Sequence, residues 1–387
     1  MAGREGAGVE HYSTLELDPK VFSRKSFMDR ALRNLRKIEI IVANLKRRHT
    51  GVTSTIMALL PEQTKRLQIA ALGPKLPAQW PRITWSDLLR HGFKPPRGKR
   101  LRIWHARRNL EALTGIILRS LLGMPLKLVF TSAAQRHHSR WTHWLMRQMD
   151  AVVATSPETA SYLLVPAKII FHGVDTARFF PAEDREREWR ASGLAGRFGI
   201  AVFGRVRHQK GTDLFIQAMC RLLPQFPDFT AVIIGAVTAD HYRFASQLKS
   251  MIAAAGLSDR IRFLGERPAA EIPLWFRRVS IVVAPQRWEG FGLVPLEAMA
   301  SGSAVVASRV GAAHHVVADE HTGYLVSPGD LDALVRRLEI LMRDPQLTLT
   351  MGQCGRAHVA NHFSIEREAG ELERVYKSCW ESSDPSA

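Results

Sequence analysis

The stretch APQRWEGFGLVPLEAMASGSAVVAS, residues 284–308, decides the fold. The apolar segment 279–284, which stops at a proline, predicts a buried strand, and Ala304–Ser308 predicts a second one. Between them, a loop with two glycines leads into a helix expected over 293–300. Gly302 ends this helix, because glycine readily takes the left-handed conformation of a helix C-cap. Strand, loop, helix and strand form a βαβ unit, and its loop lies where open α/β sheets bind ligands.

Two carboxylates lie in this stretch, Glu289 in the loop and Glu297 in the helix. Gly290 and Gly292 let the backbone approach a ligand closely, and the helix start offers unpaired N–H groups to an anion. Because helical side chains lean toward the N-terminus, Glu297 is expected to point back at that anion site. The pattern suits a diphosphate with one glutamate toward each end. The alternative is a solvated Glu289 and a Glu297 on a polar helix face.

The composition is that of a soluble globular protein with two domains. The chain has 387 residues, of which 46% are hydrophobic. Its three scattered cysteines argue against a disulfide framework or a zinc site and favour a reducing cytosol. No apolar run reaches the roughly eighteen residues of a spanning helix, and no secretory signal is apparent.

The positive charge is concentrated in the first half of the chain. Residues 1–180 hold 30 lysines and arginines against 12 acidic residues, whereas residues 181–387 hold 24 of each. A basic surface of this kind favours nucleic acid, an anionic membrane or an acidic substrate. Nucleic acid is the weakest of these, because the sequence has no zinc spacing, RNA-binding signature or helix-turn-helix pattern. A merely solvated basic surface is the alternative.

Polar residues follow several predicted strands of the first half, where a parallel sheet would present a site. Strands are expected over 38–43, 101–104 and 126–130. The polar residues that follow them and enter the candidate site are Arg47, Arg48 and Gly51, then His105, Arg107 and Asn109, then Gln135 and Arg136. The sequence contains neither a G-x-G-x-x-G nor a P-loop, which counts against a dinucleotide oxidoreductase or an NTPase.

A second anion site is predicted after the strand 199–203. The sequence there reads G-R-x-x-x-x-K-G and runs from Gly204 to Gly211. Arg205 can bind phosphate in a forked geometry, while Lys210 acts as a point charge.

Two sequence patterns resemble metal sites, but a different role is predicted for each. Asp330 and Asp332 have the spelling of a D-x-D motif, but they open a predicted helix, where aspartate is favoured as a cap. The histidines at 137, 138 and 143, together with Trp141 and Trp144, predict a basic aromatic helix face without nearby acidic partners. This face is interpreted as surface packing or as a contact with lipid.

The stretch E-G-F-G-L-x-x-L-E-A-M-A-x-G resembles the signature of family-4 glycosyltransferases of the GT-B fold. The resemblance implies that Glu289 faces the donor sugar, that Glu297 faces the ribose, and that G-R-x-x-x-x-K-G holds the diphosphate. The donor-binding residues it implies are Gly51, Gly204, Arg205, Lys210, Glu289, Gly290, Phe291, Gly292, Leu293 and Glu297. The catalytic residues it implies are Glu289, Arg205, Lys210 and His105, with His105 or Arg107 near the transferred sugar.

The resemblance also implies an architecture of two Rossmann-like, doubly wound domains around a cleft. The expected parts are a poorly ordered basic extension over 1–37, an acceptor-binding domain over 38–180, a nucleotide-sugar-binding domain over 181–362, and a C-terminal helix and tail over 363–387 that cross back to the first domain. A polar linker is expected over 181–196, and Met28 is an alternative start of the chain.

Three segments of the first half together resemble bacterial lipopolysaccharide-core mannosyltransferases, and this resemblance extends over nearly all of 38–380. The segments read N-L-K-R-R-H-T-G-V-T-S-T, W-H-A-R-R-N and F-T-S-A-A-Q-R. The resemblance implies retaining transfer of mannose from GDP-mannose to a Kdo-bearing lipid A, without a metal or other cofactor. The acceptor-side candidates are Arg47, Arg48, Arg107, Asn109, Gln135 and Arg136. It also implies a cytoplasmic enzyme, peripheral on the inner membrane, whose partners are a nucleotide sugar and an anionic glycolipid.

Three alternatives to this function stay open. Another nucleotide sugar, or another glycolipid or exopolysaccharide acceptor, would keep every motif. A hydrolysing sugar-nucleotide epimerase shares the architecture but would need further acid–base carboxylates. A non-enzymatic binder of anionic lipid or nucleic acid would explain the charge and leave Glu289, Glu297, Arg205 and Lys210 without a role.

Overall fold

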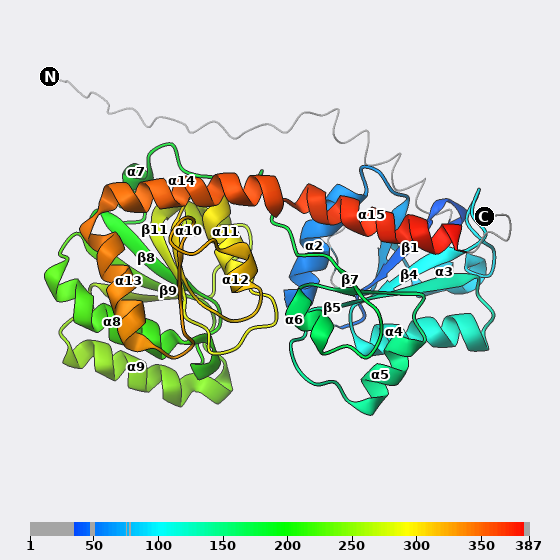
Figure 1. Cartoon of the computed structure of the whole chain (residues 1–387), viewed down its shortest axis with the longest axis horizontal. Coiled ribbons are helices and arrows are strands. Elements are labelled where there is room, and N and C mark those ends of the chain that lie inside the picture. Colours follow the sequence, from blue (N-terminus) through cyan, green and yellow to red (C-terminus); the bar gives the residue numbers. More distant parts are fainter. Residues whose placement is uncertain (1–34, 47–50, 75, 77–78, 383–387) are drawn as a thin grey trace, which may run out of the picture.

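The structure, a computed structural model, describes residues 35–46, 51–74, 76 and 79–382. In these residues two parallel sheets, each covered by helices on both faces, form two domains that lie side by side (Figure 1). The predicted pair of Rossmann-like, doubly wound domains is therefore confirmed. Within the described ranges, no helix combines the length and the apolar character needed to cross a bilayer.

The first domain is built on a sheet with the order β3-β2-β1-β4-β5-β6-β7, in which every pairing is parallel. Its strands are β1 (Ile40–Ala43), β2 (Ile69–Leu72), β3 (Arg82–Ile83), β4 (Arg102–Ala106), β5 (Leu126–Ser132), β6 (Ala151–Ala154) and β7 (Lys168–Ile169). Its helices are α2 (Gly51–Gln63), α3 (Trp85–His91), α4 (Asn109–Ile116), the π-helix η2 (Ile117–Leu121), α5 (Arg140–Arg147) and α6 (Pro157–Ser161). The central strands β1 and β4 are buried along their whole length; β1 is a continuous apolar run, whereas β4 also buries Arg102 and His105.

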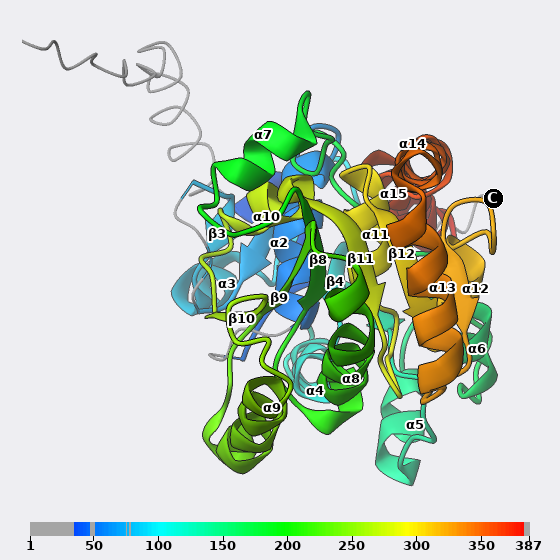
Figure 2. The same cartoon turned by 90° about the vertical axis from the view of Figure 1, so that its left-hand side faces the viewer.

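The second domain is built on a parallel sheet with the order β10-β9-β8-β11-β12-β13. Its strands are β8 (Phe198–Phe203), β9 (Phe229–Ile234), β10 (Ile261–Gly265), β11 (Val279–Ala284), β12 (Ala304–Ser308) and β13 (Tyr324–Val326). Its helices are α7 (Arg185–Arg190), α8 (Thr212–Leu222), α9 (Tyr242–Ala254), α10 (Ile272–Arg278), α11 (Val294–Ala300), α12 (Ala313–Val316), α13 (Leu331–Arg343) and α14 (Pro345–His362). Helices α8, α9 and α13 cover one face of this sheet, and α7, α10, α11 and α14 cover the other (Figure 2).

The C-terminal helix α15 (Ile365–Glu381) returns to the first domain, as predicted (Figure 1). It buries Ile365, Leu372 and Tyr376 against α2 and the first sheet. The two segments that cross between the domains touch one another, because Val174 and Ser364 form a parallel bridge. The two chain crossings between the domains therefore lie side by side.

Helix α2 runs past Pro61 to Gln63 with the proline inside it, and it packs against α15. One expectation about local structure is wrong. The linker expected over 181–196 contains α7, in which Trp189 is fully buried. Most of the extension 1–37 lies outside the described residues, but Leu35–Lys37 forms a short 3₁₀ helix with Leu35 buried.

The interpretation of Asp330 as a helix cap is confirmed. Its carboxylate accepts a hydrogen bond from the Ala333 backbone N–H at 2.8 Å, at the start of α13. The neighbouring Asp332 pairs with Arg221 at 2.7 Å. Both carboxylates therefore have structural partners.

Candidate active site

A cavity of about 910 Å³ lies between the two domains. Its lining comes from the segments that follow β1, β4 and β5 in the first domain and β8 and β11 in the second. A cavity of about 780 Å³ lies at the other end of the second sheet, against the first residues of β8 and β9. Because doubly wound sheets bind ligands at the carboxyl ends of their strands, the interdomain cavity is the candidate site.

Lys210 and Glu289 meet in this cavity as an ion pair. Lys210 ends the short 3₁₀ helix His208–Lys210 after β8, and Glu289 lies in the loop after β11. The second carboxylate oxygen of Glu289 accepts a hydrogen bond from the Gly290 N–H at 3.1 Å. Each side chain is about one-fifth exposed, so both remain open to a ligand.

Arg205 adds a second cation beside this pair, because it is exposed and lines the same cavity. Gly204 precedes it with a φ of 125°, a conformation that favours glycine, at the point where the chain leaves β8. Burial lowers the pKa of the nearby Arg207, and repulsion from Arg205 lowers it further. The predicted phosphate-binding segment therefore gathers positive charge at the carboxyl end of β8.

The loop after β11 passes very close to the first domain. A Cβ on Gly290 would lie 2.5 Å from the carbonyl oxygen of Ala133, which follows β5. The indole of Trp288 donates a hydrogen bond across the cleft to the carbonyl oxygen of Gln135 at 3.3 Å. Gly290 is thus the residue that lets the two domains approach each other here.

Glu297 lies on the first turn of α11, and it is not among the residues that line the cavity. Burial raises the pKa of Glu297 to about 7, while the positive charge of Arg178 opposes the rise. The neighbouring residues Phe291, Gly292 and Leu293 do line the cavity. The structure thus brings one of the two predicted glutamates directly into the site.

The first-domain wall of the cavity is basic. Arg107, only 7% exposed, donates a hydrogen bond to the Thr55 hydroxyl at 3.1 Å. Arg108 is fixed by Glu111 at 2.8 Å and by Asn44 at 2.9 Å. This wall also includes Lys46, Gly51, Asn109 and Arg136.

Three acceptor-side predictions lie outside the described residues or outside the cavity. Arg47 and Arg48 are not among the described residues. Gln135 does not line the cavity, since its side-chain amide donates to the Ser156 hydroxyl at 3.1 Å. Its backbone, however, accepts the hydrogen bond from Trp288.

His105 is a correction to the predicted catalytic set. The side chain is fully buried in the first domain, with Nδ1 at 2.7 Å from the Tyr376 hydroxyl and Nε2 at 2.8 Å from the Thr131 hydroxyl. Burial lowers the pKa of His105 well below its ordinary value, and the charge of Arg107 adds to this effect. Because both ring nitrogens are occupied, His105 ties the sheet to α15 and cannot contact a sugar in the cleft.

Among the cavity-lining residues that the sequence reasoning missed are Arg108, His172 and Trp288. His172 is held by Glu368 of α15 at 2.9 Å, and its ring packs edge-on against Phe291 at 4.8 Å between centroids. His172 follows β7, and a polar residue after the carboxyl end of a parallel strand was the signal that could have found it.

The sequence matches known proteins along most of its length. A family model described as Glycosyl transferases group 1 matches residues 184–358. Lipopolysaccharide core biosynthesis mannosyltransferase LpcC of Rhizobium leguminosarum bv. viciae is 52% identical over 346 residues, which cover 89% of this chain and 97% of the relative. The protein of the same description, LpsB, of Rhizobium meliloti (strain 1021) is 48% identical over 350 residues, which cover 89% and 99%.

The solved structure of Anabaena HepE in complex with UDP resembles this fold with a TM-score of 0.75. The sequence identity is 20%, and the match covers 88% of this chain and 100% of that chain, which shows a common architecture. The 52% identity to LpcC extends over most of both chains, and the structure has a cleft between two parallel-sheet domains. The chain therefore belongs to the group 1 glycosyl transferases and is a glycosyltransferase of the GT-B fold.

Proposed function

We propose that this enzyme transfers mannose from GDP-mannose to the Kdo-bearing lipid A of the lipopolysaccharide inner core, with retention of the anomeric configuration. The two relatives described as lipopolysaccharide core biosynthesis mannosyltransferases support the sugar and the pathway. The observation that carries the proposal is the group of Arg205, Lys210 and Glu289, which faces a basic wall of the first domain across the cavity.

The two cations act on the leaving group. Negative charge grows on the diphosphate as the sugar–phosphate bond breaks, and preorganised cations stabilise that charge strongly in a partly desolvated cleft. Lys210 is already held by Glu289, so little reorganisation is needed when a diphosphate arrives. Arg205 offers a forked donor for the same group. With this charge supplied by side chains, we expect turnover without an added metal ion.

Glu289 acts on the sugar. Its carboxylate is oriented by the Gly290 N–H and by Lys210, and its exposed part accepts hydrogen bonds from sugar hydroxyls. The acceptor hydroxyl attacks the anomeric carbon from the side of the leaving diphosphate, and a phosphate oxygen takes the hydroxyl proton. The glycosidic bond forms as the bond from the anomeric carbon to the phosphate oxygen breaks, and GDP departs.

The basic wall acts on the acceptor. Lys46, Arg107, Arg108 and Arg136 line the first-domain side of the cavity. Kdo carries a carboxylate and lipid A carries phosphates, and arginine binds both groups in a bidentate manner. The fixed guanidiniums of Arg107 and Arg108 suit recognition at a defined position.

We infer that the exposed surface of helices α4, η2 and α5 faces the membrane, which would suit a lipid acceptor. Exposed apolar side chains gather there, with Leu121 exposed by 78%. The others are Leu110, Ile117, Leu122, Trp141 and Trp144. The two indoles stack with centroids 5.0 Å apart, and exposed arginines flank them at 140 and 147. Aromatic and basic side chains together favour the interface of an anionic bilayer.

A donor screen tests the reaction. Purified full-length protein is given GDP-mannose, UDP-glucose, UDP-N-acetylglucosamine or ADP-heptose with Kdo-lipid A in EDTA, and product is followed by mass spectrometry. We expect a preference for GDP-mannose and an α-linked mannose product, with at least about 10²-fold loss in Glu289→Gln. A preference for another donor would refute the mannose assignment, and unchanged lipid binding without turnover of any donor would favour a binding protein.

Vesicle co-sedimentation tests the membrane surface. The double variant Trp141→Ala/Trp144→Ala should bind phosphatidylglycerol vesicles at least about tenfold more weakly, because each buried indole contributes on the order of 2 kcal/mol. The control is Trp85→Ala, which removes an indole of similar exposure on α3. Equal losses in both variants would refute the assignment of this surface.

A further inference from the structure

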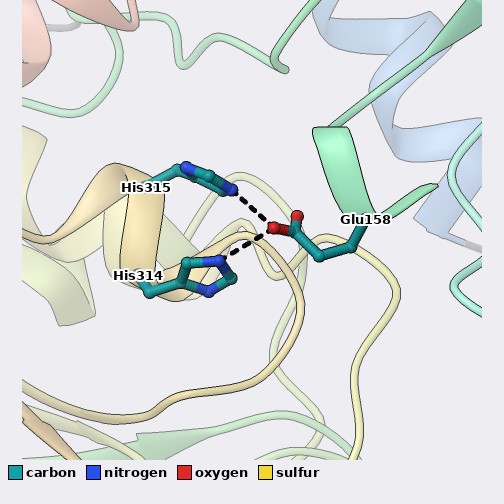
Figure 3. A group of neighbouring side chains, drawn as sticks. All are labelled: Glu158, His314 and His315. Atoms are coloured by element: carbon teal, nitrogen blue, oxygen red, sulfur yellow. Dashed lines mark hydrogen bonds and ion pairs between the residues drawn. The ribbon is translucent and has the colours of Figure 1, made fainter. Parts of the chain in front are cut away.

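Glu158, His314 and His315 converge from opposite domains at a site outside the catalytic cavity (Figure 3). Glu158 lies on α6 of the first domain, and the two histidines lie on α12 of the second. The Nε2 atoms of His314 and His315 are 2.9 Å and 2.7 Å from the same carboxylate oxygen. The three ligand atoms lie within 4.8 Å of one another.

The chemistry of these three groups is that of a transition-metal site. Two imidazole nitrogens and one carboxylate oxygen form a His₂Glu set, which leaves a fourth position open on a tetrahedral Zn²⁺. The imidazole rings lie only 4.1 Å apart between centroids, so both can reach one ion together with the carboxylate.

The three groups are accessible from solvent. Both histidines are about one-third exposed, which leaves a path for an ion to enter.

The spacing needs only a small adjustment. Ligand atoms about 2.1 Å from a tetrahedral zinc lie roughly 3.4 Å from one another. The nitrogen–oxygen separations of 2.9 Å and 2.7 Å would have to widen by about 0.5 to 0.7 Å. Changes of side-chain torsion on two short surface helices can supply that movement.

We propose that Glu158, His314 and His315 form a Zn²⁺-class divalent-cation site that bridges the two domains. The ion takes one ligand from the first domain and two from the second, so it holds the arrangement in which the domains meet across the cleft. It makes no contact with the group of Arg205, Lys210 and Glu289, and the proposal does not depend on which sugar the enzyme transfers.

Calorimetric titration with zinc chloride tests the site on the untagged full-length protein after treatment with EDTA. We expect one equivalent of tightly bound Zn²⁺ in the parent protein. Glu158→Gln, on one domain, and His314→Ala/His315→Ala, on the other, should each weaken that same equivalent by at least about tenfold. Cobalt(II) absorption in the visible range provides a second measurement, because the d–d bands of a low-coordinate site disappear with its ligands.

The control removes a histidine from another pair. The rings of His358 and His362 lie 5.0 Å apart on α14, so His358→Ala should leave the tight equivalent unchanged. Loss of binding in the double histidine variant but not in Glu158→Gln would refute the bridge between domains. Absence of a tight equivalent in the parent protein, or its persistence in the double histidine variant, would refute the site.

Discussion

Gly290→Ala tests whether the close approach of the two domains at Ala133 positions the loop that carries Glu289. The backbone at Gly290 does not have a left-handed φ, so alanine fits the local conformation. The added Cβ would nevertheless lie 2.5 Å from the Ala133 carbonyl oxygen, whereas real Cβ atoms essentially never come within 3.0 Å of such an atom and ordinary contact begins at 3.4 Å. The loop that carries Glu289 would have to withdraw by roughly 0.5 to 0.9 Å from the first domain.

A displacement of nearly 1 Å in a positioned catalytic group can cost about 10²-fold in rate. We therefore expect kcat/KM for mannosyl transfer to fall about 10²-fold, which corresponds to about 2.7 kcal/mol. Steady-state kinetics with the proposed donor and acceptor measures this loss, and the midpoint of thermal unfolding should change little because each domain keeps its own core. Gly370→Ala is the control, since a Cβ there meets open space. Wild-type turnover by Gly290→Ala would show that the approach of the domains at Ala133 is not needed for catalysis.

Three further outcomes follow from the site. Lys210→Ala should lower kcat by about 10²- to 10³-fold. In the double variant with Glu289→Gln, kcat should fall by less than the product of the two single losses, because the groups act as a pair. A loss equal to that product would contradict the pairing. Burial raises the pKa of Glu297 to about 7 from 4.5. The folded protein therefore holds a proton that the unfolded chain releases, and the free energy of unfolding falls by up to about 3 kcal/mol as pH rises from 4.5 to 7. Glu297→Gln should flatten this decline in urea titrations, and an unchanged slope would contradict it. His105→Ala should destabilise the fold by about 1 to 3 kcal/mol, since two buried hydroxyls lose a partner, yet leave kcat of the folded fraction within a fewfold; a large loss of kcat would contradict its structural role.

The fold could be predicted from the sequence where local signals are self-contained. The βαβ unit from β11 to β12 was located closely, because two buried apolar runs are bounded by proline and glycine. Helix α14 was missed, because its fit depends on distant partners. Gly352 lies against the Gly302 carbonyl, and Gly355 lies against Met299, so these glycines serve close packing where a local pattern suggests a weak helix.

For the candidate site, too, the residues with a local sequence signal could be predicted and those that depend on distant partners could not. The segments of Arg205, Lys210 and Glu289 were identified because each carries its chemistry in a few consecutive residues. His105 was misassigned because its partner Tyr376 comes from the last helix, 271 residues away in the sequence. Trp288 was missed for a similar reason, since its role depends on Gln135 in the other domain. The periodic spacing of apolar residues does not predict contacts between residues so far apart in the sequence.

The contacts between the domains also explain how the cleft can open. Trp288 with Gln135 is a single hydrogen bond across the cleft, and a bond of this kind contributes on the order of 1 kcal/mol. In the ion-free protein, Glu158 and the two histidines add contacts of similar strength. Rotation of one domain can therefore break these contacts at modest cost when no ion bridges the domains.

The two segments that cross between the domains, by contrast, are bound firmly to each other. Val174 pairs with Ser364, and the pair is so close that Gly173 has no room for a side chain against the Ser364 carbonyl. Glu368 of α15 binds both the Gly173 N–H, at 2.8 Å, and His172. The rotation is therefore expected to concentrate at the ends of this paired segment. Because the His172 ring packs against Phe291, a movement of the paired crossing segment would also displace the loop that carries Glu289.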